Sequence, residues 1–442
     1  MMLNDPRSHG LWGKTAPAPP PTRALEGEVM TDVAIIGGGY TGLSTALHLG
    51  ERGIGCIVVE AEQIGFGGSG RNVGLVNAGM WVMPEELIAT LGADHGSRLL
   101  DLLGNGPAQV WDITRRYDID CEATPVGTLH AGVGRKGFGE LAERARQWQK
   151  RGAPVELLGK AEAARMLGTH AFEGALLDRR AGTIQPLAYA RGLAQAAIGK
   201  GAAVHTDTPA LALERSGNGW LVRTPKGAIR AGRVVVATDM YTRFVMAEIA
   251  RQQVVLPYFN MATTPLPEDV AKTIVPGRQG VWDTKEVLLS YRFDRMNRLI
   301  FGSVGALKNG GAAVHRAWAR TALRRLYPQI GPVDFEQEWF GNIGMTSDNL
   351  PRFHRLDDGV FAFCGYNGRG IAPGTVFGQC MAALLAGEIA ESDLPLPVTR
   401  PAPAAWRGLQ QLFYETGAQA VHLAEAGRNT FLKSASFPKG AP

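Results

Sequence analysis

A glycine-rich pattern near the N-terminus constrains the fold more than any other stretch of the chain. Residues 31–60 read TDVAIIGGGYTGLSTALHLGERGIGCIVVE. The β-branched runs Val33–Ile36 and Cys56–Val59 are typical of buried parallel strands, and Thr41–Arg52 between them carries apolar residues at helical spacing. The stretch therefore predicts a βαβ unit, and with it an α/β fold.

Three glycines stand at the GxGxxG spacing between the first strand and the helix. Gly37 permits the tight turn, Gly39 leaves room for a pyrophosphate beside the backbone, and Gly42 lets the helix lie close to the sheet. Glu60, about 20 residues on, can accept hydrogen bonds from ribose hydroxyls. The pattern predicts a dinucleotide site. The alternative, a glycine-rich turn in an ordinary βαβ unit, does not explain the position of the acid.

Length and composition limit the remaining possibilities. A chain of 442 residues is long enough for two domains, and its hydrophobic content of 45% is ordinary for a globular protein. The net charge of +5 fits a solvated surface better than a nucleic-acid interface, although anionic substrates remain open. The four cysteines form no CxxC pair, so we expect no metal site and a reducing compartment.

No apolar signal core is present at the N-terminus, and no run approaches 18 apolar residues. We therefore expect no transmembrane helix and a cytoplasmic protein.

A glycine-rich loop follows the βαβ unit in Ala61–Met80. Backbone amides near Ser69–Gly74 are expected to face a pyrophosphate or a ring, with Arg71 adding positive charge. The loop leaves the carboxyl end of the second strand, where open α/β sheets bind ligands. The alternative is a surface Ω-loop.

A second strand–glycine turn–helix pattern lies near the other end of the chain. Val360–Cys364 predicts a buried strand, Gly365–Gly370 a turn, and the residues around Pro373 the first turn of a helix. The N-terminus of this helix can direct its positive dipole at an anion.

The pattern of elements predicts a Rossmann-like nucleotide-binding domain and a discontinuous substrate domain built on an antiparallel β-sheet, α+β overall. Residues 1–30 form an N-terminal arm, which Trp12 is a candidate to anchor; a partly disordered tail is the alternative. The boundaries that we expect are 31–83, 159–243 and 340–400 for the nucleotide-binding domain, 84–158 and 244–339 for the substrate domain, and 401–442 for a C-terminal helix and tail.

A dinucleotide unit closed by a distant glycine-rich strand–helix is typical of flavoproteins. The sequence resembles the D-amino-acid oxidase superfamily of FAD-dependent oxidoreductases, and most closely its gamma-glutamylputrescine oxidase-like branch. The resemblance rests on ALEGEVMTDVAIIGGGYTGLSTALHL, GGSGRNVG and CGYNGRGIAPGTVFG, and in motif order it covers most of residues 10–390.

The resemblance implies an FAD site shared by both ends of the chain. Its expected cofactor-binding residues are Gly37, Gly39, Tyr40, Thr41, Gly42, Glu60, Ala61, Ser69, Gly70, Arg71, Asn72, Val73, Gly74, Leu75, Ala210, Ala237, Thr238, Gly341, Asp348, Gly368, Arg369, Gly370, Ile371 and Ala372.

Departures from the family pattern affect the cofactor and its reoxidation. Gly341 stands where sarcosine oxidase has the cysteine that carries flavin covalently, and the Gly65–Gly79 loop has no histidine, so we expect non-covalent FAD. A lysine of the closing motif corresponds to Ala372. The lysine that activates oxygen corresponds to Ile300, which leaves oxidase versus dehydrogenase open.

The resemblance implies an enzyme that oxidises the C–N bond of an amine or amino acid. Hydride transfer to flavin N5 gives an imine that water hydrolyses, and O₂ is reduced to H₂O₂. Arg71 and Arg369 are candidates for tuning the flavin or binding a carboxylate, and Tyr258, Tyr291 and Arg292 for facing the substrate.

Three alternatives remain. They are a dehydrogenase, or a subunit of a dehydrogenase complex, that passes electrons to a quinone or a partner protein; a flavin-dependent RNA-modifying protein; and a non-catalytic FAD-binding scaffold. The sequence identifies neither the substrate nor the oligomeric state.

Overall fold

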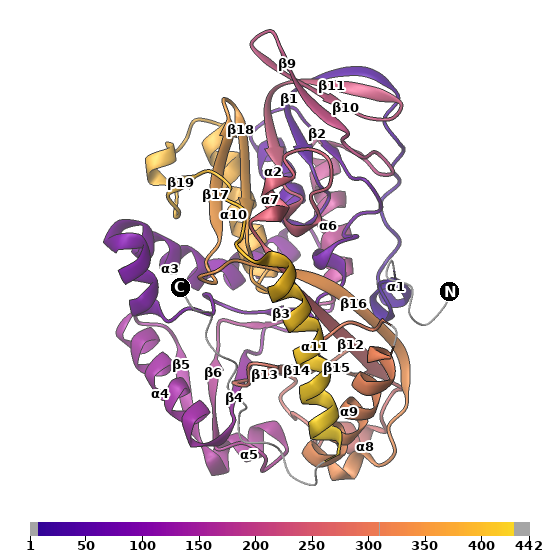
Figure 1. The fold of residues 1–442 in the computed structure, drawn as a ribbon, viewed down its shortest axis with the longest axis vertical. Coiled ribbons are helices and arrows are strands. Elements are labelled where there is room, and N and C mark those ends of the chain that lie inside the picture. The colour runs from indigo at the N-terminus through magenta and orange to yellow at the C-terminus, as the bar shows by residue number, and fades with distance from the viewer. Residues whose placement is uncertain (1–7, 309, 428–442) are drawn as a thin grey trace.

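The computed structural model describes residues 8–308 and 310–427, which contain two large β-sheets placed end to end (Figure 1). Nine strands form the sheet in the upper half of the view and eight form the sheet in the lower half. The predicted mixed α/β fold class is confirmed. Among the described residues, no helix is long and apolar enough to span a bilayer.

The first sheet contains the predicted βαβ unit. β1 (Gly27–Ile36) pairs in parallel with β2 (Cys56–Val59), and α2 (Tyr40–Glu51) connects them. The strand order is β19-β17-β18-β11-β1-β2-β8, with β10 paired to β11 and β9 paired to β10. The remaining strands of this sheet are β8 (Ala203–His205), β9 (Ala212–Ser216), β10 (Gly219–Arg223), β11 (Gly227–Val236), β17 (Arg352–Asp357), β18 (Val360–Cys364) and β19 (Val398–Thr399).

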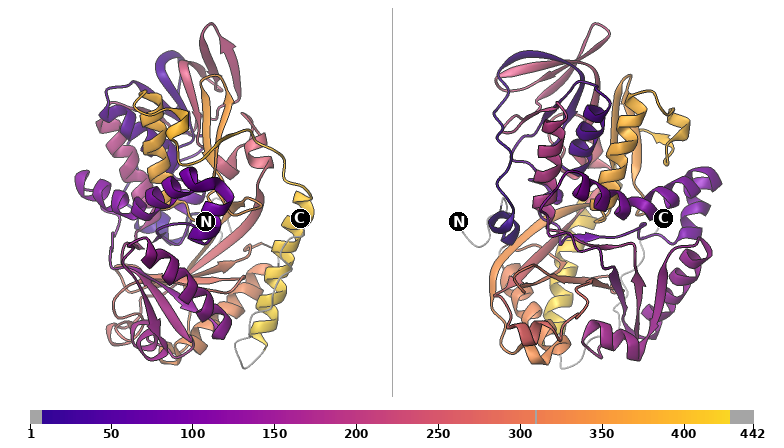
Figure 2. Two further views of the ribbon diagram at one scale, coloured as in Figure 1. Left: turned by 90° about the vertical axis from the view of Figure 1, so that its left-hand side faces the viewer. Right: turned by 180° about the vertical axis from the view of Figure 1, so that it is seen from behind.

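Four helices cover one face of this sheet, as the view from behind shows (Figure 2). α2 packs against α6 and α10, and α10 packs against α3. Close packing of α2 and α10 requires Gly378, because a Cβ there would lie 2.5 Å from the Cβ of Ser44. These helices are α3 (Pro84–Arg116, kinked at Gly92), α6 (Pro186–Gly199) and α10 (Ile371–Leu385), besides α2.

The second sheet has the order β16-β12-β15-β14-β13-β4-β6-β5, and only the β13–β4 pair is parallel. Its strands are β4 (Thr128–Gly132), β5 (Val155–Gly159), β6 (Gly174–Asp178), β12 (Val254–Thr263), β13 (Gly280–Asp283), β14 (Leu289–Phe293), β15 (Leu299–Val304) and β16 (Phe335–Met345). A separate two-stranded sheet joins β3 (Leu75–Val76) to β7 (Gly182–Thr183).

Short and long helices surround the second sheet. α9 and α11 lie side by side along it in the lower part of Figure 1. These helices are α1 (Leu11–Thr15), α4 (Gly134–Lys150), α5 (Lys160–Leu167), α8 (Glu268–Ala271), α9 (Gly311–Leu326) and α11 (Arg407–Ala426). The short helix α7 (Glu248–Arg251) packs instead against the core of the first sheet.

Strand pairing departs from the expected domain boundaries at two places. β6 falls within the expected segment 159–243, yet it pairs with β4 and β5 of the second sheet. β16 begins five residues before the expected boundary at 340 and pairs with β12 along nearly its whole length. Backbone hydrogen bonds with strands distant in sequence decide both assignments, and no local pattern reveals them.

Candidate functional site

One cavity of about 690 Å³ is lined by both sheets. Its walls come from the N-terminus of α2, the loop after β2, the turn before α10, the strands β12, β14 and β16, and α11. Its volume lies in the range of ligand pockets, roughly 300–1,000 Å³. A single ligand can therefore extend from the predicted nucleotide motif to the second sheet.

The glycine motif forms a close-packed turn at one end of this cavity. Gly37 has φ of 116°, and a Cβ on it would lie 2.7 Å from the carbonyl oxygen of Ala237. A Cβ on Gly42 would overlap the carbonyl oxygen of Gly37. Gly39 lines the cavity directly before α2, so the positive end of the helix dipole lies at the cavity wall. This backbone fits the pyrophosphate of a dinucleotide.

Backbone amides hold the carboxylate of Glu60 at the end of β2. Oε2 accepts from Gly38 N at 2.7 Å, and Oε1 accepts from Glu62 N at 3.0 Å. Burial raises the pKa of Glu60, and these two amides act against that rise by favouring the carboxylate. Each oxygen keeps a further lone pair. Glu60 can therefore accept hydrogen bonds from ribose hydroxyls, as the sequence predicts.

Three side chains from distant segments fix the glycine-rich loop that follows. Trp12 Nε1 donates to the carbonyl oxygen of Asn72 at 2.9 Å, while Trp339 Nε1 and Asn260 Nδ2 donate to that of Arg71 at 3.0 and 3.1 Å. Trp12 is fully buried and packs edge-on against Trp339. The segment predicted as an anchored arm thus positions the loop that lines the cavity.

A hydrogen bond connects the two glycine-rich turns. Thr41 Oγ1 lies 2.5 Å from the hydroxyl of Tyr366, which belongs to the second turn. Gly368 has φ of 81°, and Gly370 is the residue before α10, so a second helix N-terminus faces the cavity. The sequence prediction of two helix N-termini directed at one ligand fits this arrangement.

The second-sheet wall is polar and aromatic. The hydroxyl of Tyr258 on β12 lies 2.6 Å from Ser290 Oγ on β14. Burial raises the pKa of Tyr258, which keeps this phenol neutral and able to donate. Lys285 also lines the cavity and forms an ion pair with Glu425 of α11 at 2.8 Å.

α11 closes the cavity on the side opposite the nucleotide motif. Phe413, Tyr414 and Ala418 line the cavity. Farther along the helix, His422 Nδ1 lies 2.8 Å from His315 Nδ1, and Glu425 Oε2 accepts from Trp318 Nε1 at 2.8 Å. Buried polar contacts therefore attach the second half of α11 to α9.

Most of the predicted site residues line this cavity. They are Gly39, Tyr40, Thr41, Glu60, Ser69, Arg71, Asn72, Val73, Leu75, Ala237, Thr238, Tyr258, Gly341, Gly368, Arg369, Gly370 and Ile371. The predicted residues outside the lining are Gly37, Gly42, Ala61, Gly70, Gly74, Ala210, Tyr291, Arg292, Asp348 and Ala372. The glycines of the second group shape the turns that bring residues of the first group to the cavity wall.

Two proposed substrate-facing residues point elsewhere. Tyr291 is fully buried in the core of the second sheet, where its hydroxyl accepts from Tyr327 at 2.8 Å. Arg292 lies under α1, with its guanidinium 5.5 Å from the Trp12 ring, and it donates to the carbonyl oxygen of Ile184. Alternation along β14 puts Tyr291 on the face opposite Ser290, and Arg292 is not among the residues that line the cavity.

Three further residues named in the sequence analysis lie away from the cavity and have contacts that explain their positions. Asp348 accepts a hydrogen bond from Leu350 N at 3.1 Å and forms an ion pair with Arg352 at 2.7 Å, so its carboxylate stabilises its own loop. Ala372 is buried next to Gly106 of α3. Ile300 is buried with Trp12 rather than at the cavity.

The sequence prediction omits several lining residues: Trp81, Asp239, Tyr241, Trp282, Lys285, Asn342, Tyr366, Phe413 and Tyr414. Tyr366 lies within the predicted glycine turn Gly365–Gly370, and this position is a signal that could have identified it. Lys285 and Trp282 lie in no motif, and α11 resembles an ordinary amphipathic surface helix.

Comparisons with known proteins agree with this geometry. The family "DAO: FAD dependent oxidoreductase" matches residues 32–384. Gamma-glutamylputrescine oxidoreductase of Escherichia coli (strain K12) is 32% identical over 84% of this chain and 88% of its own length. Glycine oxidase of Geobacillus kaustophilus is 25% identical over 84% of this chain and 97% of its own.

Solved structures share the fold. Glycine oxidase from Geobacillus kaustophilus superposes with a TM-score of 0.68 at 22% identity, covering 82% of this chain and 96% of that one. L-proline dehydrogenase from P. horikoshii gives 0.68 at 18% identity, covering 84% and 99%.

Proposed function

This chain belongs to the DAO family of FAD-dependent oxidoreductases, and from that premise we propose that it oxidises the C–N bond of an amine or amino acid. FAD, when bound, accepts a hydride from the substrate carbon at flavin N5. The substrate becomes an imine, which water hydrolyses to a carbonyl compound and ammonia or a smaller amine. The two electrons pass to O₂, giving H₂O₂.

The observation that carries this proposal is the continuity of the cavity. Gly39 and Glu60 line it at the nucleotide motif, and Tyr258 and Ser290 line it at the second sheet. The first pair would hold the adenosine and pyrophosphate. The residues around Gly341 and Gly368–Ile371 would hold the ring.

Polar groups at the second-sheet wall would orient the substrate. Tyr258 supplies a neutral phenol next to Ser290, and Lys285 supplies a charge already balanced by Glu425. Hydride transfer needs no side-chain base when the amine is neutral, so binding and orientation are the main tasks of these residues.

The lining supports dissociable FAD. No cysteine or histidine among the described residues lines the cavity, and Gly341 does line it. Cys56, Cys121 and Cys364 are buried outside the cavity lining, and the partly buried Cys380 also lies outside it. Denaturation with acid is therefore expected to release all of the flavin from the protein.

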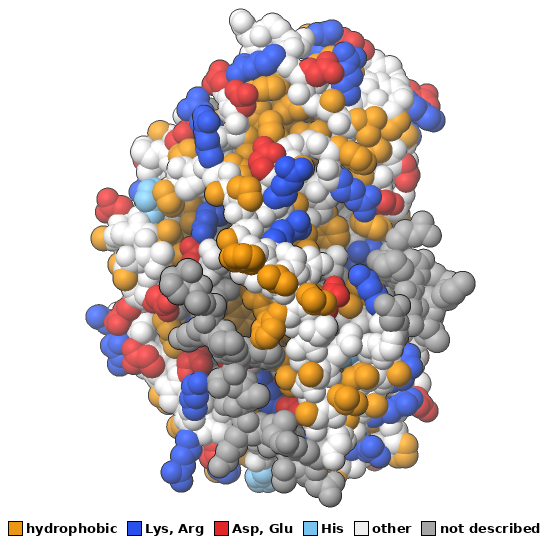
Figure 3. Space-filling view, in the orientation of Figure 1, with side chains coloured by type: hydrophobic (Ala, Val, Ile, Leu, Met, Phe, Trp, Pro, Cys, Tyr) orange, Lys and Arg blue, Asp and Glu red, His pale blue; other side chains and the backbone are white. Residues whose placement is uncertain are grey.

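A second candidate function is a dehydrogenase, alone or as a subunit of a complex, that passes electrons to a partner. The observation that favours it is an apolar stripe on the outer side of α11, where Leu409, Leu412 and Leu423 are each more than half exposed. Figure 3 shows hydrophobic side chains gathered along this helix near the centre of the face. Such patches mark interaction sites.

One experiment tests the proposal and separates the two candidates. The yellow protein is titrated anaerobically with gamma-glutamylputrescine, glycine, sarcosine and proline, followed by flavin absorbance. Bleaching by one of them supports C–N oxidation, and a protein that binds no flavin contradicts the whole proposal. On admission of air, fast recolouring with peroxide identifies an oxidase. Slow recolouring that a quinone accelerates identifies a dehydrogenase.

A further inference from the structure

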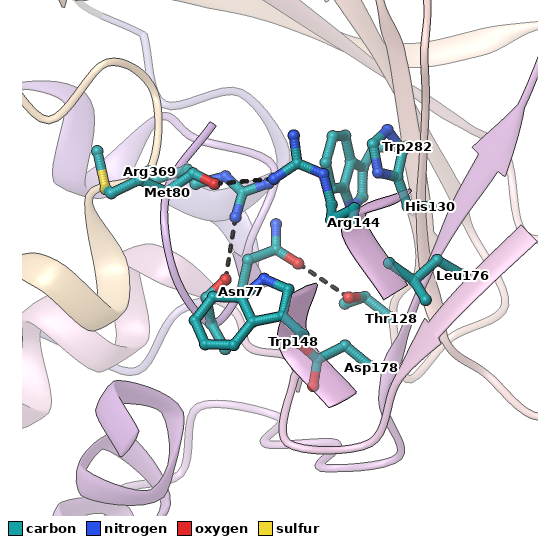
Figure 4. A pocket seen from close by; sticks show the side chains of 11 residues that line it. Asn77, Met80, Thr128, His130, Arg144, Trp148, Leu176, Asp178, Trp282 and Arg369 are labelled. Carbon is teal, nitrogen blue, oxygen red and sulfur yellow. Dashed lines mark hydrogen bonds between the residues drawn. The ribbon is translucent and has the colours of Figure 1, made fainter. Parts of the chain in front are cut away.

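A second, smaller cavity of about 30 Å³ lies behind the aromatic wall of the main one (Figure 4). Asn77, Trp282 and Arg369 line both cavities, so the two adjoin. A water molecule needs about 10–15 Å³ by this measure, so the space holds a group with about two to three heavy atoms.

Two buried guanidinium groups lie side by side in this cavity (Figure 4). Arg144 of α4 donates to the carbonyl oxygens of Trp81 at 2.7 Å and Met80 at 3.4 Å. Its nearest carboxylate, that of Glu140, lies 3.7 Å away and is 45% exposed to solvent. Arg144 Nε is buried and has no hydrogen-bond partner among the described residues.

The positive charge of Arg369 is balanced by even fewer polar contacts than that of Arg144. It donates to the carbonyl oxygen of Ala78 at 3.0 Å, and its guanidinium lies 4.6 and 4.7 Å from the ring centres of Trp81 and Trp282. Its Nε has no hydrogen-bond partner in the part of the chain that the structure describes. Burial, together with the charge of Arg144, lowers the pKa of Arg369 to about 9.

Among the described residues, Arg144 pairs only with the partly exposed Glu140, and Arg369 forms no ion pair. Asp178 lines the cavity, but Arg180 Nε and Nη2 already bind its carboxylate at 2.9 and 2.7 Å. Cation–π contacts recover only part of what a buried cation loses on leaving water. Two adjacent buried cations therefore require an anion.

The rest of the lining favours an acceptor ligand. Trp282 Nε1 is buried and has no hydrogen-bond partner among residues 8–308 and 310–427. The His130 ring stacks on Trp282 with centroids 3.3 Å apart, and burial lowers the pKa of His130 well below its usual value, so it adds no third positive charge. Thr128 already donates to Asn77 Oδ1 at 2.9 Å.

We propose that Arg144, Arg369 and Trp282 Nε1 bind one monovalent anion of carboxylate size in this cavity. Because the cavity adjoins the proposed substrate chamber at Trp282 and Arg369, the anion during turnover is the carboxylate of the substrate. This second step rests on the proposed function, whereas anion binding itself does not.

Anion binding is tested on the FAD-loaded protein with sodium acetate. Acetate should change tryptophan fluorescence in a saturable, single-site manner, because Trp81 and Trp282 flank Arg369. Arg144→Met should weaken this binding at least 10-fold. Arg146→Met, on the same helix but with its side chain 53% exposed, is the matched control and should change binding by less than 2-fold.

Trp282→Phe guards against misfolding of the arginine variant, because it removes one donor and keeps the aromatic ring. It should weaken acetate binding about 3- to 10-fold while circular dichroism shows the fold of the wild type. A crystal soaked in bromide should show anomalous density between Arg144 and Arg369. Absence of saturable acetate binding and of bromide density in the wild type overturns the proposal.

A matched pair of substrates distinguishes binding of the substrate carboxylate from binding of a free anion. The best amine substrate that carries a carboxylate is compared with its amide. We expect kcat/KM to fall at least 50-fold from acid to amide in the wild type, and less than 5-fold in Arg144→Met. Equal kcat/KM for acid and amide in a wild type that binds acetate overturns the substrate step and assigns the site to a free anion.

Discussion

Lys285 Nζ lies 2.8 Å from Glu425 Oε1, and this ion pair joins the turn after β13 to α11, 140 residues farther along the chain. Both side chains are less than a tenth exposed. Because Lys285 and α11 both line the main cavity, the pair connects the stability of the protein to closure of its candidate active site.

Glu425→Gln should detach α11 in part. The substitution removes the carboxylate of a buried ion pair, and breaking such a pair typically costs about 3–5 kcal/mol. Urea unfolding should show this loss, and trypsin should cut faster after Arg407. Glu415→Gln, on the same helix but outside the ion pair, is the control. An unchanged cleavage rate in Glu425→Gln would show that the pair does not hold the helix.

Acid should loosen the same helix. Burial lowers the pKa of His315 to about 4, below the ordinary value of 6.5, and His315 contacts His422 of α11. A depressed folded-state pKa means that stability is complete above pH 6.5 and is lost as the pH falls toward 4. His315→Gln should therefore reduce the drop in melting temperature between pH 7.5 and 4.5. If wild type and variant lose stability in parallel, this histidine is not the titrating group.

Asp283 should lower the stability of the protein at high pH, opposite to the effect of His315 at low pH. Burial raises its pKa to about 7, although the backbone amides of Lys285 and Leu289 donate to it. A raised folded-state pKa of an acid means that its stabilisation is present below about pH 4 and is lost as the pH rises through 7. The loss is at most about 4 kcal/mol. Asp283→Asn should thus gain stability over the wild type at pH 8 and not at pH 4.5, as thermal unfolding at both pH values would show.

Gly42→Ala should abolish FAD binding. The new Cβ would overlap the carbonyl oxygen of Gly37 and push α2 away from the turn. Flavin content per polypeptide is the measurement, and we expect at least a 10-fold decrease. Gly139→Ala in α4 is the control, since a Cβ there meets nothing within 4 Å and alanine favours the helix by about 1 kcal/mol. Full flavin content in Gly42→Ala would refute the role of this contact.

Tyr258→Phe should affect substrate binding, whereas Tyr291→Phe should affect thermal stability. Tyr258 lines the cavity, so losing its hydroxyl should raise KM for the amine about 5- to 10-fold, which is the value of a hydrogen bond worth about 1 kcal/mol. Tyr291 bonds Tyr327 in the core, so its variant should melt earlier with an unchanged KM. Steady-state kinetics and a thermal melt on both proteins decide this, and an effect on KM from Tyr291→Phe alone would reverse the assignment.

Local patterns predicted the elements that local interactions determine. The strand predicted over Val360–Cys364 is β18, and the βαβ unit, the second glycine turn and the family resemblance are all confirmed. Each rests on residues close in sequence, because turn geometry and helical periodicity act over a few positions.

Contacts between distant segments could not be predicted in this way. Tyr258 and Tyr291 both occupy strands, and only the register of β12, β14 and β15 decides which one reaches the cavity. Arg369 was predicted as a site residue, but its neighbour Arg144 comes from a helix more than 200 residues earlier. Such pairs depend on tertiary packing, which the spacing of residues in one stretch does not encode.

The position of α11 has a consequence for biosynthesis. Proteins are made from the N-terminus, and their early segments can fold before the later ones emerge from the ribosome. The β1–α2–β2 unit is available within the first 60 residues, whereas the helix that contributes Phe413 and Tyr414 to the cavity begins at residue 407. A nascent chain can thus form the glycine turn of the candidate site long before α11 closes the cavity.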